Sequence, residues 1–182
     1  MRSLSATIAV ALLASTGALL LTGCNDHLVT FTFEEKSQEQ VVEGRTLPNP
    51  DIIQLPYDPF TFDIDLEKQL EKRDTGPAKK VFLKGLKFKV TDTKMQGGDS
   101  DDFDFLESIT FRADAEGKKE KKVAWKNEVP DGKQSFKLQV DDSVNLKPYV
   151  EKGMKLKTEA SGKKPEDDTS MRAIIPLQVK AL

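Results

Sequence analysis

The sequence predicts an all-β protein: a two-sheet antiparallel β-sandwich, immunoglobulin-like or jelly-roll-like in plan, with one or two short helices. Three observations support this fold class. About eight segments of the 182-residue chain alternate apolar and polar residues with the period of two that half-buried strands require. Turn-forming glycine, proline, asparagine and aspartate residues separate these segments. Helical spacing occurs only in two short stretches.

The first part of the chain predicts strands, one long loop and a helix. The segment 28–35 reads LVTFTFEE and alternates cleanly, which predicts a strand. Residues 44–59 hold four prolines among polar residues, which predicts an irregular, exposed loop. A second strand is expected over 60–66, and Asp65 is expected to cap a helix over 66–72.

The rest of the chain predicts strands joined by polar turns. These strands are expected over 81–91, 106–115, 121–126, 134–140, 154–160 and 171–180. Gly85 marks a possible bulge, and Asn145 is expected to cap a brief helix that ends at Gly153. Pro176 has no backbone donor, which predicts that the last strand lies at an edge or is bulged. The polar segment 161–170 is expected to be an exposed loop.

The amino-terminal segment has the three-part layout of an export signal. Basic Arg2 precedes the apolar stretch 8–21, which is short for a membrane-spanning helix of about 20 residues. At its end stands the tetrapeptide Leu21-Thr22-Gly23-Cys24. This tetrapeptide resembles the lipobox of bacterial lipoproteins, in which a leucine three positions before the cysteine and a small residue just before it mark cleavage by the lipoprotein signal peptidase.

The resemblance implies that residues 1–23 are a cleaved signal peptide and that Cys24 carries a diacylglycerol anchor in the membrane. Residues 24–27 would be a short lipidated tether, and residues 28–182 one β-sandwich domain close to the headgroups. The expected location is the cell envelope. Asn25 stands where an aspartate would resemble an inner-membrane retention signal, which favours the outer membrane if the host is Gram-negative. The alternative, an ordinary cysteine after a transmembrane helix, lacks flanking basic residues.

Composition and charge argue against several classes of function. The chain has 28 basic and 30 acidic side chains, whereas a nucleic-acid binder needs a basic surface, so no nucleic-acid partner is expected. Cys24 is the sole cysteine, which excludes an intramolecular disulfide. His27 is the sole histidine and lies beside the expected anchor, which argues against a Ser/His/Asp triad or a histidine-rich zinc site. The lysine-rich run 118–122 includes Glu120 and predicts a solvated turn rather than a polyanion patch.

An acidic loop is the candidate for a metal site. It contains Asp99, Asp101, Asp102 and Asp104, whose carboxylates are hard oxygen ligands of the kind that calcium prefers. The loop is not an EF-hand, because Asp104 stands at the sixth position, where glycine belongs, and Thr110 at the twelfth, where a bidentate glutamate belongs. A solvated turn is therefore the preferred interpretation, and no cofactor is expected.

Two aromatic residues would suit glycan binding by stacking on a sugar ring. Trp125 lies on a predicted strand, where packing in the core or at an edge is the commoner role. Tyr57 lies in the predicted proline-rich loop, and loops are where binding residues concentrate.

The leading hypothesis is a non-enzymatic, membrane-anchored binding module for an envelope protein or glycan. It rests on the anchor, the strand pattern and the poverty of catalytic residues. One alternative is a carrier whose phenylalanines line a cavity for an apolar ligand between the sheets. A less favoured alternative is a hydrolase that uses two converging carboxylates.

Overall fold

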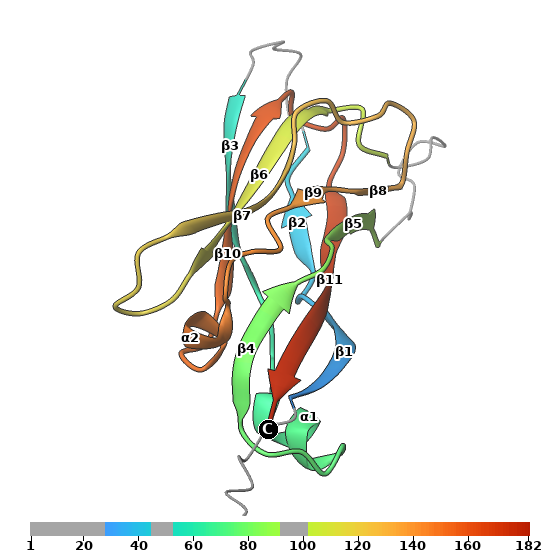
Figure 1. Ribbon diagram of the computed structural model, residues 1–182. Helices are drawn as coiled ribbons and strands as arrows, with labels where there is room; N and C mark the ends of the chain where they lie inside the picture. Colours follow the sequence, from blue (N-terminus) through green and yellow to red (C-terminus); the bar gives the residue numbers. More distant parts are fainter. Residues whose placement is uncertain (1–27, 45–52, 92–101) are drawn as a thin grey trace, which may run out of the picture.

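Two antiparallel β-sheets form the protein in a computed structural model, which describes residues 28–44, 53–91 and 102–182 (Figure 1). Buried side chains from both sheets make one hydrophobic cluster. The predicted β-sandwich with two short helices is therefore confirmed. The described part of the chain has eleven strands, because some predicted strands are divided and one was not predicted.

The six-stranded sheet is organised around β11, its longest strand. Along one side, the carboxyl-terminal part of β11 pairs with β1 and its amino-terminal part pairs with β2. Along the other side, the carboxyl-terminal part of β11 pairs with β4 and its amino-terminal part with β5, and β5 in turn pairs with β8. From Met171 to Ala181 the side chains of β11 alternate between buried and half-exposed. The strands are β1 (Val29–Lys36), β2 (Gln40–Val42), β4 (Ala78–Leu83), β5 (Lys87–Val90), β8 (Ser135–Lys137) and β11 (Thr169–Ala181).

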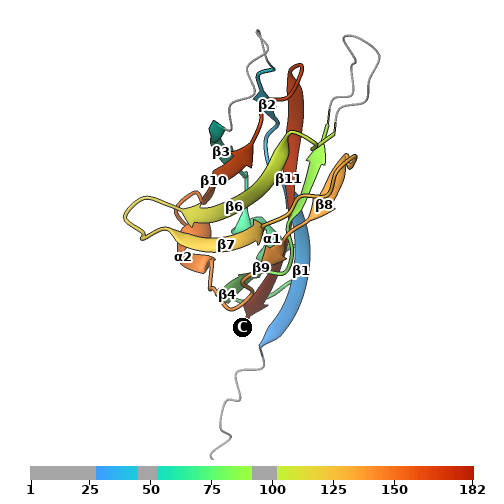
Figure 2. The same cartoon turned by 90° about the horizontal axis from the view of Figure 1, so that it is seen from above.

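The five-stranded sheet has the order β3-β10-β6-β7-β9. Figure 2 shows β6, β7 and β10 on one side of the molecule and β1, β8 and β11 on the other. The strands are β3 (Ile53–Thr61), β6 (Leu106–Asp114), β7 (Lys121–Lys126), β9 (Gln139–Val140) and β10 (Lys155–Gly162).

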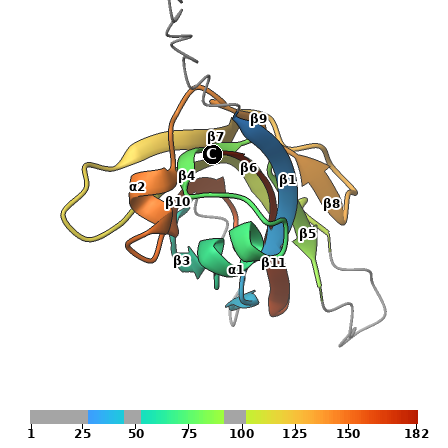
Figure 3. The ribbon, with the colours of Figure 1, turned by 60° about the horizontal axis from the view of Figure 1, so that its bottom comes forward.

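Helices α1 (Leu66–Glu71) and α2 (Lys147–Val150) lie at the end of the molecule that holds the carboxyl terminus (Figure 3). The predicted cap of α1 is confirmed, because the Asp65 carboxylate accepts a hydrogen bond from the Lys68 amide at 2.9 Å. In α2 the N-cap is Leu146 rather than the predicted Asn145. The Asn145 side chain instead bridges the Val81 and Lys147 amides, so it fastens α2 to β4.

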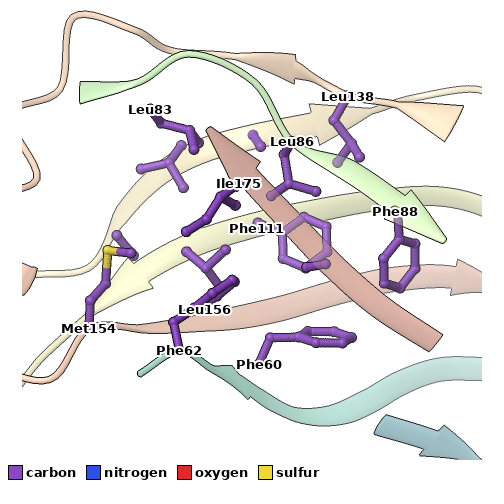
Figure 4. Close-up of a cluster of buried hydrophobic side chains, with 14 of the residues drawn as sticks. Phe60, Phe62, Leu83, Leu86, Phe88, Phe111, Leu138, Met154, Leu156 and Ile175 are labelled. Carbon is purple, nitrogen blue, oxygen red and sulfur yellow. The ribbon is translucent and has the colours of Figure 1, made fainter. Parts of the chain in front are cut away.

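Phenylalanine rings cluster in the core, and Figure 4 shows the rings of Phe60, Phe88 and Phe111 together with aliphatic side chains from both sheets. Phe88 lies among the rings of Phe60, Phe103, Phe111 and Phe136, with centroid distances of 5.0 to 5.9 Å and mostly edge-to-face geometry. Phe60 and Phe111 come from the five-stranded sheet, whereas Phe88 and Phe136 come from the six-stranded sheet. The rings therefore join the two layers.

The predicted loop 44–59 is wrong over residues 53–59, which belong to β3. There Pro56 pairs with Glu159 of β10. An edge strand tolerates proline because one of its sides needs no ladder donor, and β3 is such an edge. The strand predicted over 60–66 ends at Thr61, although Phe60 and Phe62 are both buried in the core.

The predicted strand 81–91 is two strands, β4 and β5, which break apart next to Gly85. Pro176 faces this break, and its carbonyl accepts a hydrogen bond from the Lys84 amide at 2.9 Å. The backbone nitrogen of Pro176, which has no hydrogen to donate, therefore lies opposite the gap between β4 and β5, where no strand hydrogen bond is needed. Of the two alternatives expected for the last strand, the edge position is wrong, because β11 is central to its sheet. An irregularity is present, since the register between β11 and β4 shifts between Lys180 and Ala181, although not at Pro176.

The predicted strand 134–140 changes sheets within its length. Its first part is β8 of the six-stranded sheet, and its second part is β9 of the five-stranded sheet, with buried Leu138 between them. The exposed loop predicted over 161–170 is shorter, because Gly162 ends β10, Thr169 begins β11, and both are buried. Pairing partners distant in sequence determine these boundaries.

Candidate functional site

The outer face of the six-stranded sheet is basic. Residues paired directly across strands share a face, so the partners of the outward positions of β11 lie on this surface. We call this surface the lysine face. Its cations are the strand residues Lys36, Lys80, Lys87, Lys89, Lys137, Arg172 and Lys180, together with Lys84 in the connection between β4 and β5. In the described strands of this sheet, Glu34 is the only carboxylate at an outward position.

One row across the lysine face concentrates like charges. From β1 through β11 and β5 to β8, the row reads Lys36, Ile174, Lys87 and Lys137. Lys87 and Lys137 are direct cross-strand partners, and like charges in this arrangement destabilise a sheet by a few tenths to about 1 kcal/mol. Lys80 and Lys180 form a second such pair. The fold therefore keeps positive charges together at a cost to its stability.

Acidic side chains neutralise this face only in part. Lys84 pairs with Asp142 at 2.6 Å, and Arg172 lies 3.8 Å from Glu39. The Arg172 Nε is buried without a hydrogen-bond partner among the described residues. Within the described ranges, Lys87 and Lys137 have no carboxylate within ion-pair distance. Their charges remain available to an anion from outside.

A hollow of about 430 Å³ opens in the lysine face next to the β4–β5 break. Lysines Lys84, Lys87 and Lys137 stand around it together with Glu34. Its apolar lining is Leu86, Leu138, Val140, Ile174 and Pro176. The hollow thus combines cationic and apolar groups, and its volume lies within the usual range for small-ligand pockets of about 300 to 1,000 Å³.

A larger groove of about 940 Å³ lies beside α1 and α2 and has the opposite charge. Its carboxylates are Asp63, Asp65, Glu67, Glu71 and Glu151. Two of them have structural roles, because Asp65 caps α1 and Glu151 pairs with Lys147 at 2.6 Å. The two surfaces show that the near-neutral total charge hides a strong local separation of charge.

Glu35 points toward the inside of the sandwich rather than toward the lysine face. Burial raises the pKa of its carboxyl, and the charge of Asp63 raises that pKa further. Because the folded state favours the protonated form, the ionised carboxylate opposes folding. This opposition is absent well below pH 4.5 and grows as the pH rises toward the raised pKa.

Trp125 is half-buried on the outer face of the five-stranded sheet. Its direct partners are Thr110 and Gln139, and the Lys122 ammonium lies 4.5 Å from its ring centroid. On the same sheet Arg112 pairs with Glu159 at 2.8 Å, and this hydrogen bond raises the pKa of the guanidinium. The indole therefore packs at the surface and is partly covered by a lysine. Tyr57 lies in β3, and its side chain is outside the described part of the structure.

Part of the predicted calcium loop falls within the described residues. Asp102 accepts a hydrogen bond from the Asp104 amide at 2.8 Å, and Asp104 accepts one from the Gly132 amide. Both carboxylates thus stabilise turns. Asp99 and Asp101 lie outside the described residues, as does Cys24. Among the residues that are described, no three His, Cys, Asp or Glu side chains are grouped as metal ligands.

The lysine face was missed by the sequence analysis, although part of its signal was visible. Lys87 and Lys89 alternate with apolar residues, so their outward direction could be inferred. Their neighbourhood could not be inferred, because Lys36, Lys137 and Arg172 are brought next to them by pairing between distant strands. A search for runs of lysine selects 118–122 instead, where the cations lie near the β6–β7 turn.

Comparison with known proteins gives no relatives: no protein-family model, curated protein or solved structure matches the chain. No helix in the described ranges is long and apolar enough to cross a membrane.

Proposed function

We propose that this protein is an exported, lipid-anchored, non-enzymatic β-sandwich that binds an anionic glycan of the cell envelope through the lysine face. The observation that carries the proposal is the row Lys36, Ile174, Lys87 and Lys137. Like charges paired across strands weaken the fold, and an anionic partner would relieve their repulsion. Uronate carboxylates and phosphates are the anionic groups that such a glycan would present.

The core supports this proposal over a carrier with its ligand between the sheets. Phe60, Phe88 and Phe111 contact one another at ring-centroid distances of 5.5 to 5.8 Å, an arrangement that fills the space between the layers. The acidic groove supports a hydrolase less well, because Asp65 and Glu151 are already engaged in a helix cap and an ion pair. Binding from the outer face of a sheet needs no catalytic group.

The anchor part of the proposal predicts that Cys24→Ser abolishes acylation. Labelled palmitate should enter the wild-type chain and the control Thr22→Ser, which keeps a small residue two positions before the cysteine and leaves Gly23 and Cys24 unchanged, but not Cys24→Ser. A single acyl chain anchors only marginally, so losing all acyl chains should release the protein into the soluble fraction. Incorporation of label into Cys24→Ser, or its sedimentation with membranes after a high-salt wash, would contradict the anchor.

The binding part predicts opposite effects of Lys137→Glu on affinity and stability. At low ionic strength, affinity for polygalacturonate should fall about tenfold, because one favourable charge contact is lost and one unfavourable contact is gained. Thermal stability should rise by about 1 to 3 °C, because Lys87 would then face an opposite charge. Binding is measured by calorimetric titration and stability by thermal unfolding.

The matched control is Lys119→Glu, which makes the same change of charge in the turn between β6 and β7. It should weaken polyuronate binding by less than about twofold. An equal loss of affinity in both variants would show that only net charge matters and would refute a specific face. Absence of binding between the wild-type chain and polygalacturonate at low ionic strength would refute the glycan proposal as well.

A further inference from the structure

The hollow in the lysine face is lined in part by side chains of the hydrophobic core. Leu86 and Leu138 are members of the hydrophobic core and also line the hollow. They reach it because β4 and β5 are separated there and because the chain crosses between the sheets at Leu138. An intact ladder at this point would have closed the surface over them.

Backbone contacts hold the opening in place. The Leu138 amide donates to the Leu86 carbonyl at 2.9 Å, and the Lys84 amide donates to the Pro176 carbonyl at 2.9 Å. Gly85 lies against Pro176, since a Cβ at Gly85 would come within 3.2 Å of the proline Cγ. The break between β4 and β5 is therefore a fixed part of the fold, which suits a preformed pocket.

We infer that the hollow accepts the apolar chain of an acidic glycolipid while Lys87 and Lys137 hold the adjoining phosphate or carboxylate. This inference rests on the proposed function and narrows its ligand to a glycan with an apolar chain next to an anionic group. Charge complementarity comes from Lys87 and Lys137, which have no ion pair within the described residues, and apolar complementarity comes from Ile174, Val140 and Leu138. Lys84 is already held by Asp142 and so defines the rim of the hollow.

Alkyl phosphates are minimal probes for this arrangement, because one family varies the chain and keeps the anion constant. Butyl, hexyl, octyl and decyl phosphate would be titrated below their aggregation concentrations into the full-length Cys24→Ser chain. Affinity should rise about threefold to fourfold with each added methylene until the hollow is filled. Octyl glucoside, which has the chain without the charge, should bind at least tenfold more weakly than octyl phosphate.

Two variants separate the apolar part of the site from the charged part. Ile174→Ser should flatten the dependence on chain length, and it is a tolerable change because Ile174 is half-exposed on the outer face. Lys137→Glu should weaken all four phosphates about tenfold and leave the chain-length slope unchanged. Thermal unfolding of each variant verifies that it is folded.

The outcomes distinguish failure of this inference from failure of the proposed function. Phosphate binding that depends on Lys137 but not on chain length or Ile174 would refute the inference that the ligand is a glycolipid. It would remain consistent with the proposed binding of an anionic glycan. A chain-length effect without dependence on Lys137 would overturn both the inferred site and the lysine face. Absence of saturable binding by any of the four phosphates would overturn the glycolipid inference, whatever the result with polygalacturonate.

Discussion

Replacing Phe88 by alanine is expected to lower the free energy of unfolding by about 3 to 5 kcal/mol. Phe88 is fully buried and contacts four other rings: Phe60 and Phe111 of the five-stranded sheet, Phe136 of its own sheet, and Phe103 just before β6. Its loss removes apolar burial and leaves a cavity that the surrounding rings fill only in part. Urea unfolding followed by the fluorescence of Trp125 would measure the change.

The matched control is Phe82→Ala in β4. Phe82 is half-buried on the lysine face, where the Lys180 ammonium lies 5.7 Å from its ring centroid. Its replacement should cost less than about 1.5 kcal/mol, since the ring already meets water. If Phe88→Ala costs no more than Phe82→Ala, the ring cluster is not the main contact between the layers.

Alternating apolar residues predicted the strands well wherever one face of a strand meets the core. The segments 106–115, 121–126 and 154–160 all correspond to strands, displaced by two residues or fewer at each end. In β11, which corresponds to the predicted strand 171–180, every second side chain is buried, including Ile175 and Val179. A period of two in the sequence determines the direction of a side chain, and burial on one face is enough to create that period.

Pairing between distant strands could not be predicted in the same way. Proline in 44–59 indicates a loop locally, but Pro56 is accepted because β3 happens to be an edge strand. The change of sheet at Leu138 leaves no local signal, because the side-chain alternation continues through it. The lysine face depends on the same pairing, which is why a candidate site built from five strands was not found from the sequence.

The stability of the sandwich and its proposed binding surface are in conflict at one place. Core rings such as Phe88 stabilise the two layers, whereas the pair Lys87 and Lys137 opposes folding. A sequence selected for stability alone would place an acidic residue or threonine opposite Lys87. The retained repulsion is therefore informative about function, in the way that a local departure from good folding rules often marks a binding site.

Gly162→Ala is expected to destabilise the fold by about 3 kcal/mol or more. Gly162 ends β10 with φ +152°, a conformation close to glycine-only. A Cβ there would collide with the Phe105 carbonyl oxygen and lie 3.0 Å from the Leu106 Cα. Backbone atoms of a paired strand cannot rotate away as a side chain can, so β6 and β10 would have to separate locally.

The control for this prediction is Gly117→Ala, at a glycine that also has a positive φ but has no close approach to another strand. Gly117 has φ +67° in the turn between β6 and β7, and a Cβ there would meet nothing within 4 Å. Its replacement should cost only about 1 kcal/mol, the strain of alanine in a left-handed conformation. Urea unfolding of both variants measures the difference, which should exceed about 2 kcal/mol. Equal losses of stability would mean that backbone conformation, rather than contact with β6, makes glycine necessary at position 162.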